Sequence, residues 1–319
     1  MWLFHEAKFG FIAMRRKAYV VSGVILTLGI GAMVANTVII GSWQNYGVDF
    51  TGGVLVQLRF DQPTTDNQLR EALGGVDAPP ITRFGSDNEY VVRAPIQEGV
   101  EVEDVAEGIA AQVEAAMGEG SFEVMRRESV GPKIGRELQQ KALMAVVFSL
   151  VLTLLYIGFR FEFRFGVASV IATAHDVLII LGLLALFRVE IALPTVAAIL
   201  TILGYSLNDT IVVFDRIREN LNKRGGRRED PYRLVNGSIN ETLPRTVLTS
   251  GTTLVVLLSL LVLGGAVIRD FAMVLILGVL IGTYSSIFIA SPALLEIQKR
   301  YGTGEARAKE RAARRAAAV

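Results

Sequence analysis

The sequence predicts a membrane protein, mainly α-helical, with six transmembrane helices and one small α+β domain outside the membrane between helices 1 and 2. Three observations support this fold class. Of the 319 residues, 51% are hydrophobic, and the mean hydropathy is positive, which is unusual for a soluble domain. Several apolar stretches reach the length of about 20 residues that a bilayer span requires. Lysines and arginines gather in alternate connections between these stretches, as the positive-inside rule expects.

The composition excludes several functional classes. The formal net charge of +1 gives no bulk attraction for nucleic acid, and the absence of cysteine excludes disulfides, thiolate nucleophiles and cysteine–metal sites. His5 and His175 are the only histidines, so a histidine-rich metal cluster is also excluded. The sequence lacks the G-x-x-x-x-G-K-[ST] motif that cradles ATP phosphates. We therefore expect no cofactor, no metal, no nucleic-acid partner and no enzymatic activity.

The N-terminal region is predicted to be a cytoplasmic segment followed by a membrane anchor. Residues 1–17 form a short amphipathic lead-in that ends in Arg15-Arg16-Lys17, and residues 18–40 form the first apolar run. This run is longer than the roughly 7–15 residues of a signal-peptide core, so we interpret it as an uncleaved transmembrane helix. The basic flank places the N-terminus in the cytoplasm.

Residues 41–136 are polar and acidic, and we expect them to form a separate domain outside the membrane. In order along the chain, the patterns predict a strand at 54–60, a helix at 65–73, strands at 81–84 and 89–94, a helix at 102–117 and a strand at 122–130. Thr64 or Thr65 is a suitable N-cap for the first helix, and residues 85–88 have the composition of a hairpin turn. The order β-α-β-β-α-β fits a ferredoxin-like sandwich.

Five further spans complete the membrane domain, which we place at residues 137–290. The apolar stretches lie at 142–159, 166–187, 193–214, 246–263 and 271–290. Basic connections at 160–164 and 215–243 are expected in the cytoplasm, and the connections at 188–190 and 264–270 outside. The basic tail at 291–319 belongs inside by the same rule. Both termini are therefore expected in the cytoplasm.

The fourth predicted span carries an acidic residue, Asp209, within its apolar part. A carboxylate at bilayer depth costs about 2.5–3.5 kcal/mol on insertion scales, so such a residue usually faces a bundle interior and has a function. Tyr205 lies one helical turn before it, and Asn208 is adjacent. Thr201 and Arg216 fall on the same helix face as Asp209. We expect this face to take part in proton transport.

Two other predicted spans also carry polar stripes. In the third, Ser169, Thr173 and Asp176 share a face with His175 beside them, and in the fifth, Thr242, Thr246, Thr249 and Thr253 share a face with Arg245 at the cytoplasmic end. Three neighbouring stripes can enclose a hydrated path that no single helix could line. The candidate proton-transport residues are Asp209, Asp176, Arg245, His175, Asn208 and Tyr205.

Simpler roles are open for most of these residues. Serine and threonine in membrane helices often only hydrogen-bond a neighbouring helix, for about 0.6 kcal/mol each. His175 could merely pair with Asp176, and Arg245 could mark a basic helix start. Small residues at four-residue spacing predict close helix packing. They are Gly278, Gly282, Ser286 and Ala290 in the sixth span and, as a weaker instance, Gly31 and Ala35 in the first.

Three motifs resemble those of the SecF family of bacterial protein-export membrane proteins. They are Gly47-Val48-Asp49-Phe50-Thr51-Gly52-Gly53 after the first span, His175-Asp176-Val177 in the third, and the stretch GYSLNDTIVVFDRIREN at 204–220. The resemblance extends over essentially the whole chain. It implies one half of a twelve-span pair of the resistance-nodulation-division type, completed by SecD, in the bacterial cytoplasmic (inner) membrane.

The same resemblance implies a function. The SecD–SecF pair is expected to associate with the SecYEG channel and to use the proton gradient across the lipid bilayer to assist the export of preproteins, while SecA supplies the ATP-driven push. The family's aspartate in the Asn-Asp-Thr motif, implicated in transporting protons, corresponds to Asp209. An implicated arginine at the start of the following span corresponds to Arg245. We expect protonation of Asp209 to be coupled to movement of the external domain, which is then periplasmic.

Two alternatives remain open. One is a half-subunit of a proton-driven exporter of small molecules or lipids from the same superfamily, which would need a larger external region with a substrate cleft. The other is a passive assembly scaffold, for which a neutral residue at position 209 would suffice. The short external region argues against the first alternative, and the charge of Asp209 argues against the second.

Overall fold

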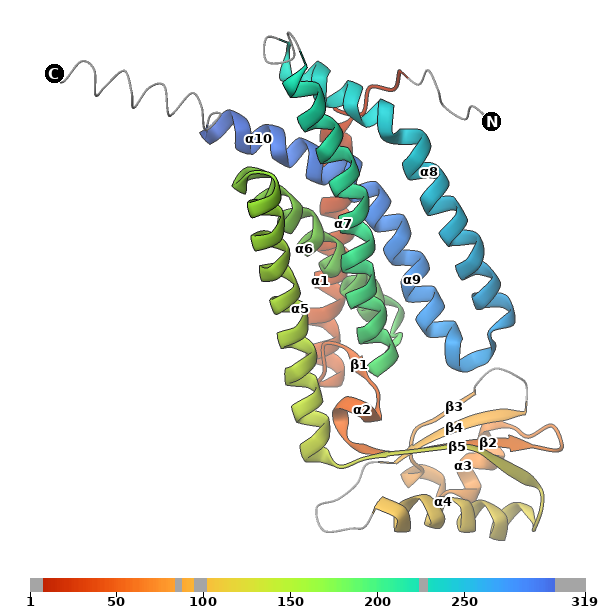
Figure 1. Cartoon of the computed structure of the whole chain (residues 1–319). Helices are drawn as coiled ribbons and strands as arrows, with labels where there is room; N and C mark the ends of the chain where they lie inside the picture. Colours follow the sequence, from red (N-terminus) through yellow and green to blue (C-terminus); the bar gives the residue numbers. More distant parts are fainter. Residues whose placement is uncertain (1–7, 84–87, 95–101, 224–228, 302–319) are drawn as a thin grey trace.

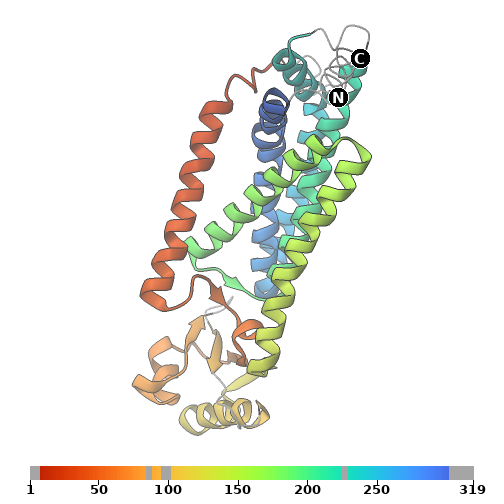
Figure 2. The same cartoon turned by 90° about the vertical axis from the view of Figure 1, so that its left-hand side faces the viewer.

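The computed structural model describes residues 8–83, 88–94, 102–223 and 229–301 of the chain. Several predicted features lie outside these residues: His5, the hairpin turn at 85–88 apart from Asn88, residues 224–228 of the predicted cytoplasmic segment, and the tail from 302 onward. Figure 1 shows a bundle of long helices with a small α+β domain beyond one end. Figure 2 shows the same arrangement from the side, with α1 along one edge of the bundle.

Within the described residues, six helices are long and apolar enough to cross a membrane, which agrees with the predicted number of spans. Five are single helices: α1 (Arg15–Ile40), α5 (Pro132–Arg160), α6 (Phe163–Phe187), α7 (Leu193–Asn222) and α8 (Pro231–Leu263). The sixth consists of α9 (Gly265–Ser285), one π-helical turn η3 (Ser286–Ala290) and α10 (Ser291–Tyr301). The predicted fold class, a mainly helical membrane protein with a small α+β domain, is confirmed.

Helices α6, α7 and the composite sixth helix form the centre of the bundle. In their most apolar windows, 50%, 44% and 56% of the residues are buried, against 6% in α1 and α5 and 17% in α8. The three outer helices therefore present apolar side chains to their surroundings, which in a membrane are lipid tails or the helices of another protein.

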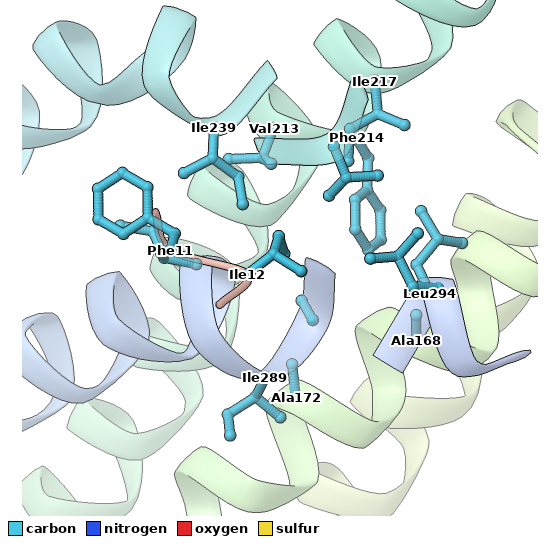
Figure 3. Close-up of a cluster of buried hydrophobic side chains, with 14 of the residues drawn as sticks. Phe11, Ile12, Ala168, Ala172, Val213, Phe214, Ile217, Ile239, Ile289 and Leu294 are labelled. Atoms are coloured by element: carbon cyan, nitrogen blue, oxygen red, sulfur yellow. The ribbon is translucent and has the colours of Figure 1, made fainter. Parts of the chain in front are cut away.

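Two apolar clusters lie at different levels of the bundle. Figure 3 shows the first, in which Phe11 and Ile12, from the segment before α1, are buried together with Phe214 of α7. The second joins α6, α7, α8 and α9 and includes Phe50, close to the α+β domain. Because lipid is as apolar as these side chains, close van der Waals packing is the main force that holds such helices together.

Small residues allow the closest helix contacts. A Cβ atom added to Gly29 of α1 would lie 2.7 Å from the Cα atom of Gly182 in α6. Likewise, a Cβ on Gly282 would lie 2.9 Å from the Cβ of Ser206, so the predicted small-residue seam of the sixth helix packs against α7. A Cβ at Gly31 would meet no atom within 4 Å, so the weaker seam has no partner helix among the described residues and stays a prediction of contact with another subunit.

The α+β domain has the predicted order of elements. Its sheet consists of β2 (Gly53–Phe60), β3 (Ile81–Arg83), β4 (Glu89–Ala94) and β5 (Phe122–Val130), all antiparallel and in the spatial order β3-β4-β2-β5. Helices α3 (Asp66–Ala72) and α4 (Val102–Met117) and the short 3₁₀ helix η1 (Gly75–Asp77) complete it. Thr65 caps α3 through a capping box with Gln68, as one of the two predicted N-caps. This arrangement agrees with the predicted ferredoxin-like sandwich.

Short elements attach this domain to the bundle. Strand β1 (Asn45–Tyr46) pairs in parallel with β6 (Glu190–Ile191), which lies in the turn between α6 and α7. Helix α2 (Val48–Thr51) follows β1 and leads into the sheet. At Gly52, where φ is +75°, a Cβ would lie 2.6 Å from the Cα of Pro132 at the start of α5. The segment before the sheet is therefore packed directly against the membrane helices.

Helices extend beyond the predicted apolar stretches in two connections, of which only the second, predicted as a loop, is contradicted by the structure. The predicted cytoplasmic segment at 215–243 is largely helical: α7 continues to Asn222, and α8 already begins at Pro231, with Asp230 as its N-cap. Pro244, inside α8, does not end the helix. The predicted external loop at 264–270 is also helical from Gly265 onward. Pro231 suits the first turn of a helix, where its missing N–H group costs nothing.

Candidate functional site

Asp209 lies in the interior of the bundle, on α7, with only 2% of its surface exposed. The hydroxyl groups of Ser250 on α8 and Thr283 on α9 lie beside its carboxylate. These two hydroxyl oxygens are 2.7 Å apart, and the Tyr205 hydroxyl lies 3.4 Å from Ser250 Oγ. We call Asp209, Ser250, Thr283 and Tyr205 the Asp209 cluster. It brings together side chains from three helices.

The polar groups around Asp209 are incompletely paired. Asp209 Oδ2 is buried and has no hydrogen-bond partner among the described residues. The same is true of Thr246 Oγ1, one turn before Ser250 on α8. A buried polar atom without a partner is costly, by about 1–3 kcal/mol and more when it is charged. The site therefore holds a carboxylate whose ionised form is poorly satisfied in this conformation.

Arg245 faces outward from α8, and its side chain is exposed. It interacts electrostatically with Asp209 but forms no ion pair with it among those that the described residues make. A second predicted neighbour, Arg216, is engaged elsewhere, with Glu219 and Glu241 at the end of the helix. The positive charge of Arg245 therefore attracts the Asp209 carboxylate from the surface of the bundle, without direct contact.

Asp176 of α6 forms a second, completely paired cluster. Its side chain is fully buried, and Oδ2 accepts hydrogen bonds from Ser206 Oγ at 2.6 Å and Ser285 Oγ at 2.7 Å. Oδ1 lies 3.0 Å from His175 Nδ1. We call these four residues the Asp176 cluster. The pairing of His175 with Asp176 that the sequence left open is present.

The Asp176 cluster continues to α1 through a chain of hydrogen bonds. His175 Nε2 lies 3.0 Å from Ser22 Oγ, which lies 3.0 Å from the Tyr284 hydroxyl. That hydroxyl donates its only proton to the carbonyl oxygen of Ala18, at 2.8 Å. Ser22 must therefore donate to Tyr284, and it must accept a proton from His175 Nε2.

These hydrogen-bond directions determine how many protons the pair of His175 and Asp176 holds. Because Nε2 is the donor to Ser22, a neutral ring has a bare lone pair on Nδ1, which would face Asp176 Oδ1. Two lone pairs do not form a hydrogen bond. One proton must therefore lie between Nδ1 and Oδ1, either as a histidinium–carboxylate pair or as a neutral histidine with a protonated acid.

The structure brings only some of the predicted site residues together. Asn208 is exposed, as is Thr201, whose hydroxyl donates to the carbonyl of Ala197 on its own helix. The α8 hydroxyls of Thr249 and Thr253 likewise bond carbonyls of their own helix. Among the described residues no hydrogen bond joins the two clusters directly, and the hydrated path formed by three stripes stays a prediction. Helices α7 and α9 contribute neighbouring residues to both clusters.

Sequence reasoning missed half of these partners. Ser250, Thr283 and Ser285 were not singled out, and neither were Ser22 and Tyr284. Ser285 lies next to the small-residue seam of the sixth helix. In the sequence alone it looks like another small packing residue, because its partner Asp176 is 109 residues away. Ser22 and Tyr284 are isolated polar groups in apolar spans, a weak signal that could have identified them. Among the described residues, no group of three or more acidic or histidine side chains could hold a metal ion.

Two family models match the chain. The model for the SecD/SecF protein export membrane protein, C-terminal, matches residues 109–300, and the SecD/SecF GG motif matches residues 45–64. Among similar proteins, the protein translocase subunit SecF of Gemmatimonas aurantiaca is 42% identical, over 98% of this chain and 94% of its own. The SecF subunit of Vibrio alginolyticus is 41% identical, over 93% of this chain and 92% of its own.

A longer relative and its structures are also similar. The protein translocase subunit SecDF of Thermus thermophilus is 41% identical over 96% of this chain, which spans 40% of the relative. The crystal structure of SecDF from that organism, described as a translocon-associated membrane protein, matches with a TM-score of 0.79 at 39% identity, over 94% of this chain and 40% of that one. A structure of SecDF in a super-membrane-facing form matches with a TM-score of 0.67 at 39% identity, over 95% and 40% of the two chains.

Proposed function

The chain belongs to the SecD/SecF family of protein-export membrane proteins, and we propose that it acts as the SecF-type subunit of the Sec protein translocase, using the proton gradient to assist export. The family models and the relatives named SecF support this role over nearly the whole chain. The six long apolar helices indicate a multi-pass protein of the bacterial inner membrane. We assign it no enzymatic reaction, since its work is to couple proton movement to a change of shape.

The partner that completes the membrane domain is a SecD subunit. The chain spans only 40% of the SecDF relative, whose name combines SecD and SecF in a single protein. Arg245 and Asn208 lie on exposed faces of apolar helices, where a polar side chain is costly if it meets lipid. A SecD surface beside α7 and α8 would supply polar contacts for both. The SecYEG channel and exported preproteins are the further partners in this proposal.

The orientation follows from charge. Lysine and arginine favour the end of the bundle where α8 begins, which we place in the cytoplasm with both termini. The proposed domain at 41–136 is then periplasmic, followed by the membrane helices at 137–290 with their cytoplasmic segment at 215–243 and the tail at 291–319. Exported chains emerge on the periplasmic side, so the α+β domain is the part that can meet them.

One observation carries the proton role: Asp209 is a buried carboxylate with an unpaired oxygen, surrounded by hydroxyl groups from two other helices. An ionised carboxylate only accepts hydrogen bonds, whereas a protonated one also donates. Gain or loss of a proton therefore forces Ser250 and Thr283 to rearrange, and with them the contacts among α7, α8 and α9. One charge that crosses 100 mV releases about 2.3 kcal/mol, enough to bias two conformations of a domain.

A direct structural route leads from Asp209 to the periplasmic domain. Asp209 lies on α7, and the backbone N–H of Leu193, the first residue of α7, donates to Asp49 Oδ2 at 2.8 Å. Glu190, just before α7, forms an ion pair with Arg93 of β4. A tilt or shift of α7 would therefore act on both α2 and the sheet. Asp176 and His175 hold one proton between them. In this proposal they keep that proton while α7 moves, and Asp209 is the residue that gains and loses a proton.

The replacement of Asp209 by asparagine tests this function. In cells that depend on this chain, Asp209→Asn should insert and assemble normally but lose the stimulation of export. Asp215→Asn is the matched control, because Asp215 lies on the same helix and pairs with Arg218 at the surface. Wild-type export by Asp209→Asn would support the passive scaffold instead. Normal export with loss of a small-molecule or lipid efflux activity would support the exporter alternative.

A further inference from the structure

A cavity of about 740 Å³ lies where the segment before α1 meets the first turns of α8. Its lining includes Lys8, Ile12, Arg15, Tyr232, Arg233 and Gly237. None of these residues belongs to the Asp209 cluster or the Asp176 cluster. Ligand sites in proteins commonly have volumes of about 300–1,000 Å³, so this cavity is large enough for a headgroup-sized molecule.

The wall formed by the N-terminal segment is held in place by two asparagines of α8. Asn240 pairs with the backbone of Phe9 in both directions, with N···O distances of 2.9 Å. Asn236 donates to the Phe9 carbonyl at 2.8 Å and accepts from the Ile12 N–H at 3.2 Å. Phe11 and Ile12 are then buried in the apolar cluster of Figure 3. The cavity is therefore built from an anchored segment.

The cavity carries excess positive charge. Lys8, Arg15 and Arg233 contribute three cations, and no carboxylate among the described residues forms an ion pair with any of them. Arg15 lies over the Tyr232 ring, 5.0 Å from its centroid, and its guanidinium donates to the Ile12 carbonyl at 2.9 Å. Glu241, the one acid among the described residues of the lining, is paired with Arg216. In the described part of the lining, three cations and one acid leave a formal charge of +2.

We propose that this cavity binds the phosphate headgroup of an anionic phospholipid. Basic pockets beside transmembrane helices on the cytoplasmic side are suited to such headgroups. In the proposed orientation the cavity lies at the cytoplasmic membrane surface, because Arg15 is also the first residue of α1. The proposal depends on this orientation and not on the proton role of Asp209.

The surface beside the cavity indicates a lipid rather than a soluble phosphate. Directly after Arg15, the first turns of α1 expose apolar side chains: Val20 is 65% exposed, Val21 51% and Val24 52%. Acyl chains attached to a phosphate in the cavity can lie along this face, whereas a free phosphate would make no use of it. A diacyl lipid therefore satisfies the charge of the cavity and the apolar surface of α1 at once.

Lipid retention by the purified full-length chain, measured by native mass spectrometry in detergent, tests the proposal. The probes are dioleoyl phosphatidylglycerol and the zwitterionic dioleoyl phosphatidylcholine. Wild-type protein should retain the anionic lipid preferentially. Arg233→Gln should weaken this retention about fivefold, the effect of about 1 kcal/mol for one cation near anionic lipid. Arg233 forms no hydrogen bond or ion pair with another described residue, so the substitution should leave the fold unaffected.

A second variant fills the cavity without changing its charge. A Cβ on Gly237 would meet no atom within 4 Å, so Gly237→Leu can be accommodated in α8 and its side chain would occupy the cavity. This variant should also lose preferential retention of the anionic lipid. Lys299→Gln, on α10 and outside the lining, is the charge control and should retain the lipid within about twofold of wild type.

Three outcomes would overturn the proposal. The first is equal retention of the two lipids by the wild type, and the second is wild-type retention by both Arg233→Gln and Gly237→Leu. The third is displacement of the bound lipid by millimolar inorganic phosphate, which would identify a site for free phosphate. Size-exclusion profiles and helix content by circular dichroism confirm that each variant is folded.

Discussion

The carboxylate of Asp49 and the backbone N–H of Leu193, 144 residues apart in the chain, form a hydrogen bond of 2.8 Å. Asp49 lies in α2, which leads into the sheet of the α+β domain, and Leu193 is the first residue of α7, the helix that carries Asp209. A negative charge at the start of a helix satisfies a free N–H group and interacts favourably with the helix dipole. In the proposed mechanism, this bond is one of the contacts through which a movement of α7 reaches the domain, beside the ion pair of Glu190 with Arg93.

Asp49→Ala should uncouple the two parts while leaving each folded. We expect a loss of about 1 kcal/mol of stability, typical of a missing helix cap, and a much larger loss of gradient-stimulated export. Thr65→Ala is the matched control, since it removes the capping box of α3 within the domain at a similar cost. Thermal unfolding and export assays compare the two. Equal export by both variants would mean that the Asp49 bond transmits nothing.

The contact between Gly29 and Gly182 predicts a position-specific effect in α1. Gly29→Ala places a Cβ 2.7 Å from the Gly182 backbone, which cannot move aside as a side chain could. We expect a loss of about 1–3 kcal/mol, seen as a lower unfolding temperature in detergent. Gly31→Ala, two residues away and facing open space, should be neutral or stabilise the helix slightly. Similar effects at the two glycines would contradict the observed packing of α1 on α6.

The hydrogen-bond chain from Asp176 to Tyr284 predicts a change of histidine state in Tyr284→Phe. Without the tyrosine hydroxyl, Ser22 is free to donate to His175 Nε2, and the neutral Nδ1–H tautomer becomes possible. Nitrogen-15 spectra of histidine-labelled protein distinguish these states. His5→Gln leaves His175 as the only histidine, so its signals are assigned directly.

With Tyr284 present, His175 should carry a proton on Nε2. Its Nδ1 atom should either carry a second proton or accept a hydrogen bond from protonated Asp176. The Tyr284→Phe spectrum should gain the Nδ1–H tautomer. A wild-type spectrum that already shows a neutral Nδ1–H ring would contradict the proton accounting, and an unchanged spectrum in Tyr284→Phe would show that Tyr284 does not control the ring. Asp176 need not be altered in this experiment, which preserves the packing of α6.

Local patterns were sufficient for most of the fold. The bounds of β4, α4 and β5 agree with the predicted ranges, because alternation and amphipathic periodicity are strong there and glycines end the elements. The ends of α7 and α8 were not predictable in the same way. A proline usually marks a helix boundary, yet α8 continues through Pro244. Membrane helices tolerate a proline when neighbouring groups satisfy the backbone atoms that lose their hydrogen bonds.

Pairings between distant residues explain why the site was predicted only in part. A buried aspartate is conspicuous in an apolar span, so Asp209 and Asp176 could be identified from sequence. Which hydroxyl group meets which carboxylate depends on how α7, α8 and α9 pack, and nothing local to Ser285 or Ser250 encodes it. For the same reason the sequence could not show that the two acids belong to two separate hydrogen-bonded clusters.

Gradient-dependent export by purified components measures whether protonation of Asp209 drives export. Vesicles that contain the SecYEG channel, SecD and this chain are given ATP and SecA, and export of a preprotein is measured with and without a protonophore. We expect wild-type export to fall when the protonophore is added, while Asp209→Asn gives the same low export in both conditions and Asp215→Asn behaves as wild type. Export by Asp209→Asn that is as high as the wild type and equally sensitive to the protonophore would show that Asp209 does not couple the gradient to export.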